Sequence, residues 1–423
     1  MFKKLLLTIP ALLLLMNCSA STAMLIEDQP LKGINITVDP GHGDTKAYDT
    51  FRIGPGGERE EWINLRVAKY LSRKLTLAGA NVLMTREKDR DVSLGGRARL
   101  AKSHASDLLV SIHHNGSGND LGMDLPIVYF FGPATQNPAS VDFAKILIDR
   151  MRSDLTFEQP LAGAVYSDHL IYNSGTSILR NTVNDMPGVI GEGGFFTNTQ
   201  GEKRLKTRAY NRLEADIYFE AILEYFERGI PKASHVLPDS FLFIDFKQEL
   251  EFHLDDGFGN AFFDNSTVKI FQDGEPLKST WDPVAGILKA RPLPSEERKV
   301  SFQVFGRNLQ GNSIHPRPFK YLTERGYNWL THEKWREAFD EAQQYYTQFE
   351  ALQVDTTGER INALEASLHL YQLSLELQIV HPEARLAEEQ ILYLLEKKQA
   401  LLNTDLSDEI EAQKDRLRDF YPE

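Results

Sequence analysis

Three separated segments of the chain carry side chains that could hold a metal ion. They contain His42 between two glycines, Glu60 in an acidic stretch, and His113 beside a second imidazole. Two imidazoles and one carboxylate form a ligand set that leaves zinc one open position for a water molecule. A fourth segment supplies Glu192, whose carboxylate could take a proton from such a water. The residue types therefore indicate a metal-dependent hydrolase.

Taken singly, each of these three residues has a simpler explanation. His42 between glycines is typical of a turn. Glu60 precedes a predicted helix, where a carboxylate stabilises the helix dipole, and Glu58 and Glu61 compete with it for any other role. His113 ends a predicted strand, where a histidine is more often a hydrogen-bonded structural residue. The metal hypothesis therefore depends on their occurring together.

Alternating strands and helices must position these residues. Strands are predicted at 34–39, 81–86, 107–113, 127–131 and 188–192, and helices at 61–78, 94–102, 140–155 and 207–228. This alternation predicts an α/β domain with a mostly parallel sheet and helices on both faces. Loops at the carboxyl ends of such strands bind ligands, and His42 lies on the first of them. His114 points to the opposite face from His113 if the strand continues.

The length of 423 residues predicts two or three domains. Short alternating stretches with turn signals between them predict a small β-sandwich, with strands at 241–246, 250–254, 267–271 and 300–305. Amphipathic helices at 329–352, 359–379, 381–402 and 406–421, with Pro382 at a first helical position, predict an all-α C-terminal domain. A tetratricopeptide-type array is an alternative, although no 34-residue period aligns. The expected domains are 31–230, 236–325 and 326–423.

The N-terminus has the features of an export signal. Two lysines precede an apolar run at 5–16, which is too short to span a bilayer as a helix. Cys18, the only cysteine, follows this run and resembles the lipidated cysteine of bacterial lipoproteins, although Asn17 departs from the usual small residue. Ser19 then favours sorting to the outer membrane. The alternative is an ordinary signal peptide cut within 19–23. Residues 1–18 are the expected signal peptide, and 19–30 a tether.

Composition restricts the partners and the compartment. The formal net charge of −13 argues against nucleic acid, which binds basic surfaces. A single cysteine leaves no disulfide pair, so stability must come from packing even in an oxidising compartment.

The order and spacing of six strings resemble those of a known family. They are residues 39–43, Glu60 with Asn64 and Leu65, Thr85-Arg86, Ser93-Leu94 with Arg97, residues 111–115, and Glu192 with Gly194, Phe195 and Asn198. Over 34–229 they resemble the zinc-dependent N-acetylmuramoyl-L-alanine amidases called amidase family 3. The resemblance implies one zinc ion, held by His42, Glu60 and His113, and implies that Glu192 is the catalytic glutamate. It selects Glu60 over its neighbours and His113 over His114.

The resemblance also implies the reaction. The expected substrate is the peptidoglycan amide between N-acetylmuramic acid and L-alanine, cut in the periplasm for wall remodelling or daughter-cell separation. The alternatives are a non-catalytic wall-binding scaffold and an amidase for small muropeptides. Three positions depart from the family: Asp44 and Gly193 replace a common glycine and a common Thr or Ser, and His114 replaces a small residue. None of these departures removes an implied ligand.

Further contacts are expected around this site. Arg180 could bind an anionic part of the stem peptide or form a surface salt bridge, and His114 and Asn115 are candidate substrate contacts. Arg86 and Arg97 are expected to brace the fold. The two C-terminal domains are expected to bind an envelope or division protein; the alternatives are that they bind peptidoglycan or hold the enzyme at a fixed height above its membrane. Membrane association is expected only through the N-terminal lipid.

Overall fold

The computed structural model describes residues 29–44, 52–118, 122–235, 244, 246–297, 299–323, 333–352, 358–377 and 383–420. The predicted signal peptide with Cys18, most of the tether and nearly all of the strand predicted at 241–246 lie outside these residues. So do the start of the helix predicted at 329 and the pair 381–382. The chain folds as two compact units. The first comprises Met1–Lys232, Asp255–Asp264 and Gly306–Arg317, and the second comprises the remainder.

A six-stranded sheet organises the first unit, in the order β2-β1-β3-β6-β4-β5. Its strands are β1 (Asn35–Pro40), β2 (Asn81–Met84), β3 (Leu108–Asn115), β4 (Ile127–Phe130), β5 (Ala164–Ser167) and β6 (Gly188–Phe195). The first four strands in this order run parallel, whereas β4 is antiparallel to β6 and parallel to β5. The predicted mostly parallel sheet is therefore confirmed.

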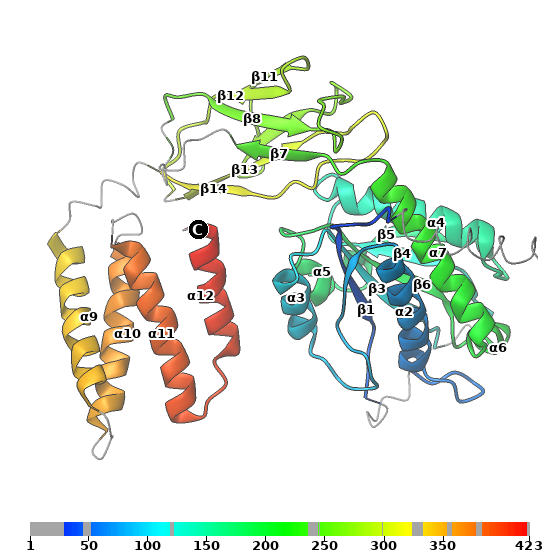
Figure 1. Ribbon diagram of the computed structural model, residues 1–423, viewed down its shortest axis with the longest axis horizontal. Coiled ribbons are helices and arrows are strands. Elements are labelled where there is room, and N and C mark those ends of the chain that lie inside the picture. The colour runs from blue at the N-terminus through cyan, green and yellow to red at the C-terminus, as the bar shows by residue number, and fades with distance from the viewer. Residues whose placement is uncertain are drawn as a thin grey trace, which may run out of the picture. The chain divides into compact units, whose positions relative to one another are not determined.

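Helices cover both faces of this sheet, as predicted (Figure 1). They are α2 (Glu60–Leu77), α3 (Leu94–Ser103), α4 (Pro138–Asp154), α5 (Ser177–Arg180), α6 (Thr199–Leu205) and α7 (Arg208–Glu227). The main core packs α2, α4 and α7 against one face, where Val110 and Ile112 of β3 point. A smaller core packs α3 and α5 against the other face, where Leu109 points. Since side chains alternate along a strand, His113 belongs to the α3 face and His114 to the α7 face.

Two loops from later in the chain complete the first unit, Asp255–Asp264 and Gly306–Arg317. Asn312 lies in the second loop and is fully buried. Its side-chain amide donates to the carbonyl oxygens of Tyr225 at 2.7 Å and Gly229 at 2.8 Å. The last carbonyl groups of a helix have no partner within it. Asn312 therefore caps the C-terminal end of α7.

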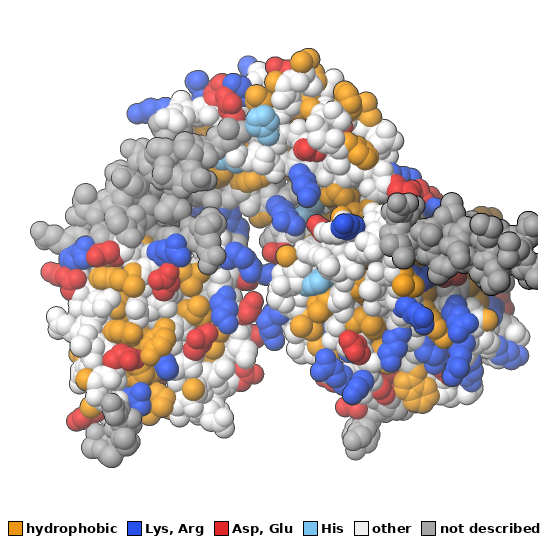
Figure 2. Space-filling model, in the orientation of Figure 1, with side chains coloured by type: hydrophobic (Ala, Val, Ile, Leu, Met, Phe, Trp, Pro, Cys, Tyr) orange, Lys and Arg blue, Asp and Glu red, His pale blue; other side chains and the backbone are white. Residues whose placement is uncertain are grey.

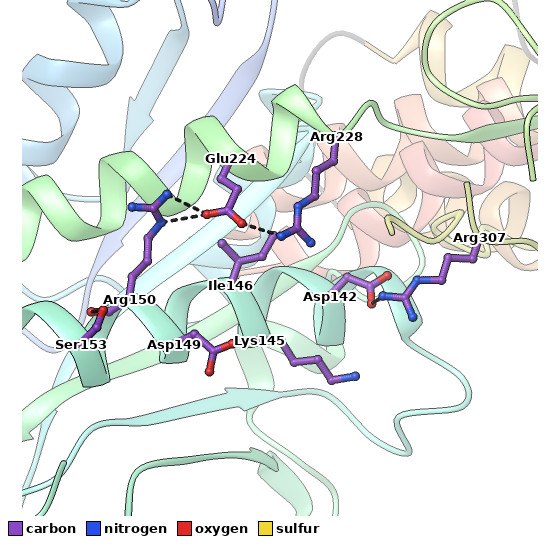
Figure 3. A pocket seen from close by; sticks show the side chains of 9 residues that line it. All are labelled: Asp142, Lys145, Ile146, Asp149, Arg150, Ser153, Glu224, Arg228 and Arg307. Carbon is purple, nitrogen blue, oxygen red and sulfur yellow. Dashed lines mark hydrogen bonds and ion pairs between the residues drawn. The ribbon is translucent and has the colours of Figure 1, made fainter. Parts of the chain in front are cut away.

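Further hydrogen bonds attach the same loop. The side-chain amide of Asn308 donates to the carbonyl oxygen of Arg228 at 2.8 Å. The backbone N–H of Ser313 donates to Asp142 on α4 at 2.9 Å. Arg307 donates to the other oxygen of that carboxylate at 3.0 Å (Figure 3). The loop is thus bonded to both α4 and α7.

A cavity of about 430 Å³ lies beside these contacts and is lined mainly by charged side chains (Figure 3). Glu224 accepts hydrogen bonds from both Arg150 and Arg228. The full lining is Asp142, Lys145, Ile146, Asp149, Arg150, Ser153, Glu224, Arg228 and Arg307. Ion pairs among these residues neutralise most of this charge, so we interpret the cavity as a structural cluster of salt bridges.

Two antiparallel four-stranded sheets make the β-rich part of the second unit, in the orders β10-β9-β13-β14 and β11-β12-β8-β7. Their strands are β7 (Lys232–His235), β8 (Leu250–Asp255), β9 (Lys269–Gln272), β10 (Glu275–Pro276), β11 (Ser279–Asp282), β12 (Ile287–Ala290), β13 (Lys299–Phe305) and β14 (Phe319–Leu322). The ring of Phe252 lies 5.1 Å from that of Phe319 in the other sheet. This face-to-face packing confirms the predicted β-sandwich.

The C-terminal part consists of α9 (Glu333–Ala351), α10 (Glu359–Leu377), α11 (Ala384–Leu402) and α12 (Ser407–Phe420). Each helix packs against the next, around a core that includes Trp335 stacked on Phe339 at 4.8 Å. Acidic and basic side chains are interspersed on the visible face of these helices (Figure 2). The all-α prediction is confirmed, whereas the predicted boundary at 326 stays a prediction. Among the described residues, none of the helices is long and apolar enough to cross a membrane.

Candidate metal centre

Three elements bring the predicted ligand residues together. His42 follows β1, Glu60 begins α2 and His113 lies in β3. One donor atom from each lies within 4.8 Å of the others. Nε2 of His42 is 3.1 Å from Oε2 of Glu60, and Nδ1 of His113 is 3.1 Å from Oε1 of the same carboxylate. Side chains from separate loops and strands thus converge on one point.

The neighbouring glutamates face other partners. Glu61 is fully buried and pairs with Arg59. Glu58 pairs with Arg66 at 2.7 Å. The geometry therefore brings Glu60, and neither of its neighbours, to the two imidazoles.

The glycines around His42 allow the loop to approach β3 closely. A Cβ atom on Gly41 would lie 2.2 Å from Nε2 of His113. Gly43 has a φ of 143°, and a Cβ atom there would lie 2.0 Å from the carbonyl oxygen of Arg90. His42 itself has a φ of 58°, in the left-handed region. Substituting either glycine would displace the loop that carries His42.

A buried ion pair fixes the start of this loop. Arg97 donates to the carboxylate of Asp39 at 2.7 Å and to the carbonyl oxygen of His42 at 2.6 Å. Thr85 and Ser111 also donate hydroxyl hydrogen bonds to Asp39. Burial favours a raised pKa for Asp39, but Arg97 and the hydroxyl groups outweigh it and hold the pKa below its usual value. The expected bracing role of Arg97 fits these contacts.

Arg86 holds the other side of the loop. It is fully buried, and it donates to the carbonyl oxygens of Pro40 at 2.9 Å, Gly41 at 2.8 Å and Glu61 at 2.9 Å. Burial, followed by the nearby Arg97, lowers the pKa of Arg86 to about 10, so it stays charged at neutral pH. It joins the loop to the first turn of α2.

The candidate ligands have protonation states suited to a cation. Burial acts to raise the pKa of Glu60, but the imidazoles of His42 and His113 hold it well below its usual value. Burial lowers the pKa of His113 despite the neighbouring carboxylate. An ionised carboxylate and a neutral imidazole are the forms that coordinate a metal. The site is thus chemically ready for one.

Glu192 lies beside this cluster. It pairs in register with His113 across β3 and β6, so the two side chains share one face of the sheet. Its Oε2 atom is buried and makes no hydrogen bond to any residue that the structure describes. Burial, and next the negative charge of Glu60, raise the pKa of Glu192 well above its usual value. A carboxyl group whose pKa is raised takes up a proton more readily than an ordinary glutamate does.

The three predicted substrate contacts lie in different settings. His114 is buried on the α7 face, so the structure does not bring it to the open side of the site. Asn115 is partly exposed at the end of β3, and its Oδ1 accepts from the N–H of Gly116 at 2.9 Å. Arg180 is exposed, and it donates to Ser174 and to the carbonyl oxygen of Gly175. In the structure, Arg180 therefore stabilises the backbone at Ser174 and Gly175.

A cavity of about 480 Å³ opens at the cluster. Its lining includes His42, His113 and Asp91, together with the apolar side chains of Leu94 and Ile178. Leu94 is 57% exposed, so an apolar edge borders a polar centre. Such a site can hold a ligand by its uncharged part while polar groups act on it.

Sequence reasoning missed two buried polar residues near the site, Glu214 and Tyr218, and assigned no contact to a third, Asn64. Asn64 donates to Glu60 at 3.1 Å, and Glu214 and Tyr218 of α7 lie against glycines on either side of Glu192. The available signal was a glutamate at helical spacing among the buried residues of α7. A charged residue on an apolar helix face needs a buried partner.

Part of the chain is similar to known proteins. Residues 36–224 match the family described as N-acetylmuramoyl-L-alanine amidase. The N-acetylmuramoyl-L-alanine amidase AmiA of Escherichia coli is 28% identical over 226 residues, which cover 45% of this chain and 75% of AmiA. The uncharacterized protein YqiI of Bacillus subtilis is 28% identical over 201 residues, covering 47% of this chain and 88% of YqiI.

A solved structure is also similar. The N-acetylmuramoyl-L-alanine amidase AmiC2 of Nostoc punctiforme is 25% identical, with a TM-score of 0.40, over 46% of this chain and 98% of that chain. Each of these similarities covers less than half of this chain. Residues 36–224 are thus similar to N-acetylmuramoyl-L-alanine amidases, and the family match together with the amidases named among the sequence relatives supports this enzyme class for the domain.

Proposed function

We propose that the domain is a zinc-dependent peptidoglycan amidase. It cuts the bond between the lactyl group of N-acetylmuramic acid and the L-alanine of the stem peptide. The observation that carries the proposal is the convergence of His42, Glu60 and His113 within 4.8 Å, with Glu192 in register beside His113. The family match and the names of the relatives support the substrate class.

The donor set fits zinc. Two imidazole nitrogens and one carboxylate oxygen match the three protein ligands of hydrolytic zinc sites. When bound, zinc supplies a Lewis acid that polarises a carbonyl group and makes a water molecule acidic enough to attack at neutral pH. Arg86 and Arg97 hold the His42 loop in place through backbone carbonyl groups, so the ligand geometry is fixed in advance.

Glu192 is the proton carrier in this proposal. Its buried carboxylate accepts a proton from the attacking water and then delivers it to the nitrogen of the leaving L-alanine. The raised pKa of Glu192 favours the first transfer, because a more basic carboxylate takes up a proton more readily. Because β6 pairs Glu192 in register with His113, its carboxyl group is held on the same face of the sheet as this candidate ligand.

The substrate lies in the cavity beside the cluster in this proposal. Leu94 and Ile178 provide an apolar wall for the lactyl and alanine methyl groups, and the polar centre faces the amide. The cavity is open to solvent at Leu94, which allows a polymer strand to extend beyond it.

We also propose that the protein acts in the periplasm during wall remodelling or cell separation, anchored to the outer membrane through a lipid on Cys18. The support is the N-terminal sequence alone. Labelling with a radioactive fatty acid tests it: wild type should be labelled and fractionate with the outer membrane, and Cys18→Ala should lose the label. An unlabelled wild-type protein in the soluble fraction would contradict the anchor.

The test of the enzymatic proposal is metal dependence of wall digestion. Purified protein is treated with a chelator, dialysed, and given zinc or buffer before incubation with sacculi. Zinc should restore release of peptides that begin with L-alanine, and His113→Ala should release none at the same zinc concentration. A protein that binds sacculi but contains no zinc and releases no peptide would instead be a wall-binding scaffold.

A further inference from the structure

A second imidazole lies directly behind the candidate metal centre. His114 is 2% exposed and points toward α7, away from the cavity. Its Nδ1 atom is 2.8 Å from Oδ1 of Asn64, and its Nε2 atom is 3.0 Å from Oε2 of Glu214. Asn64 in turn donates to Glu60 at 3.1 Å. A continuous hydrogen-bonded chain therefore runs from α7 to the carboxylate of the candidate ligand.

The orientation of Asn64 follows from its partners. Its Nδ2 atom lies 3.2 Å from the carbonyl oxygen of Gly41 and 3.1 Å from Oε1 of Glu60, and both of these atoms only accept hydrogen bonds. The amide oxygen must then face His114, so Nδ1 of that ring carries the proton. The backbone N–H of His114 also points at Oε1 of Glu60, at 3.3 Å.

Glu214 completes the chain on the other side of the ring. With Nδ1 protonated, Nε2 and the carboxyl group of Glu214 share one proton, whichever atom holds it. The pair is therefore neutral overall, which limits the cost of burying it. A Cβ atom on Gly193 would lie 2.2 Å from Oε1 of Glu214 and 3.1 Å from Nε2 of His114. The glycine beside Glu192 thus provides the space that the pair occupies.

We propose that His114 and Glu214 position Glu60 by locking the side-chain amide of Asn64. Oε1 of Glu60 faces Asn64 and the backbone of His114, which leaves Oε2 to face His42. Without the imidazole, the amide of Asn64 could rotate and the carboxylate would lose its fixed orientation. Groups that orient metal ligands in this way typically change metal affinity by about 10–100-fold when they are removed. The inference rests on the proposed metal site.

The test measures zinc affinity by competition with a fluorescent chelator, using the full-length protein without substrate. His114→Ala should bind zinc about 10–100-fold more weakly than wild type. His114→Asn should lose less than about tenfold, since its amide can donate to Asn64 as Nδ1 does. Likewise, Glu214→Leu should weaken binding, whereas Glu214→Gln should retain it because its amide can donate to Nε2.

Glu388→Gln is the matched control, a buried glutamate in α11 that should leave zinc affinity unchanged. Wild-type affinity in folded His114→Ala, or equal losses in the Ala and Asn variants, would overturn the proposal. If His114→Ala does not fold, the zinc affinities of His114→Asn, Glu214→Leu and Glu214→Gln test the proposal. If the variants change zinc affinity as expected but the zinc-loaded wild type releases no stem peptide, only the enzymatic proposal is refuted.

Discussion

The amidase domain and the C-terminal helices bury different kinds of side chain. In the first, the side chains of Asp39, Arg86, Arg97 and Glu60 are all nearly inaccessible. Arg86 and Arg97 donate to the His42 loop, Asp39 pairs with Arg97, and Glu60 contacts the imidazoles. In the described part of α9–α12, the core is mainly apolar and aromatic, and Glu388 is the one charged side chain that is buried. Buried charge costs free energy unless it is paired. The concentration of paired, buried charges around the His42 loop therefore indicates a functional site in this part of the molecule.

The largest expected effect comes from Glu192→Gln, which removes the proton carrier but keeps the size of the side chain. Hydrolysis of sacculi should fall by about 10²–10⁴-fold, the usual contribution of a general acid–base group. Zinc content, measured by atomic absorption, should stay at the wild-type level because Glu192 is not among the clustered ligands. Unchanged turnover would remove Glu192 from the mechanism.

Asp39→Asn breaks the buried ion pair with Arg97. It should destabilise the domain by about 3–5 kcal/mol, because a guanidinium group stays buried without its counter-charge. Urea unfolding followed by circular dichroism measures this loss.

The lowered pKa of Asp39 also predicts that the stability of the protein depends on pH. Its pKa is lowered in the folded state, so its contribution is present above the unfolded value of about 3.9 and is lost as the pH falls through the folded value. The wild-type protein should lose stability in this acid range more steeply than Asp39→Asn. Parallel acid profiles for the two proteins would contradict the ion-pair argument.

Asn312→Ala tests the attachment of the Gly306–Arg317 loop to α7. The substitution leaves two buried carbonyl groups without a donor, at a cost of about 1–3 kcal/mol each. Amide hydrogen exchange near residue 225 should accelerate, while zinc affinity stays unchanged. A fragment that ends at residue 230 should show the same acceleration, because it lacks Asn308 and Asn312 altogether. Wild-type exchange in that fragment would show that the loop is dispensable.

Glu388→Gln should have the smallest effect. Glu388 accepts from Arg416 at 2.7 Å, but that arginine is 42% exposed and can return to water. A cost of about 1–2 kcal/mol is expected, with no change in sacculus digestion. A loss of digestion would show that the helices act on the amidase domain.

The sequence predicted the framework of the amidase domain well and its short elements poorly. Strands with continuous apolar runs, such as β3, and long amphipathic helices were located within a few residues. β5, α5 and α6 were missed because four to seven residues give little periodicity. The antiparallel direction of β4 was also missed, since the pattern of buried residues is the same in either direction.

The candidate site also contains residues that the sequence predicted and residues that it did not. His42, Glu60 and His113 could be found because the strings around them, taken together and in order, resemble those of a known family. The predicted opposite orientation of His114 agrees with the structure, but its partner Glu214 lies 100 residues away, and no local pattern connects them. Long-range pairing of buried polar groups depends on the packing of α7, which the sequence alone does not specify.

Identification of the products of wall digestion tests the central claim most directly. Purified sacculi are incubated with the zinc-loaded wild-type protein, and the soluble fragments are analysed by mass spectrometry. The amidase account predicts intact stem peptides that begin with L-alanine, and glycan strands whose muramic acid carries a free lactyl carboxylate. Peptides cut within the stem, new reducing sugar ends, or no fragments at all would contradict it.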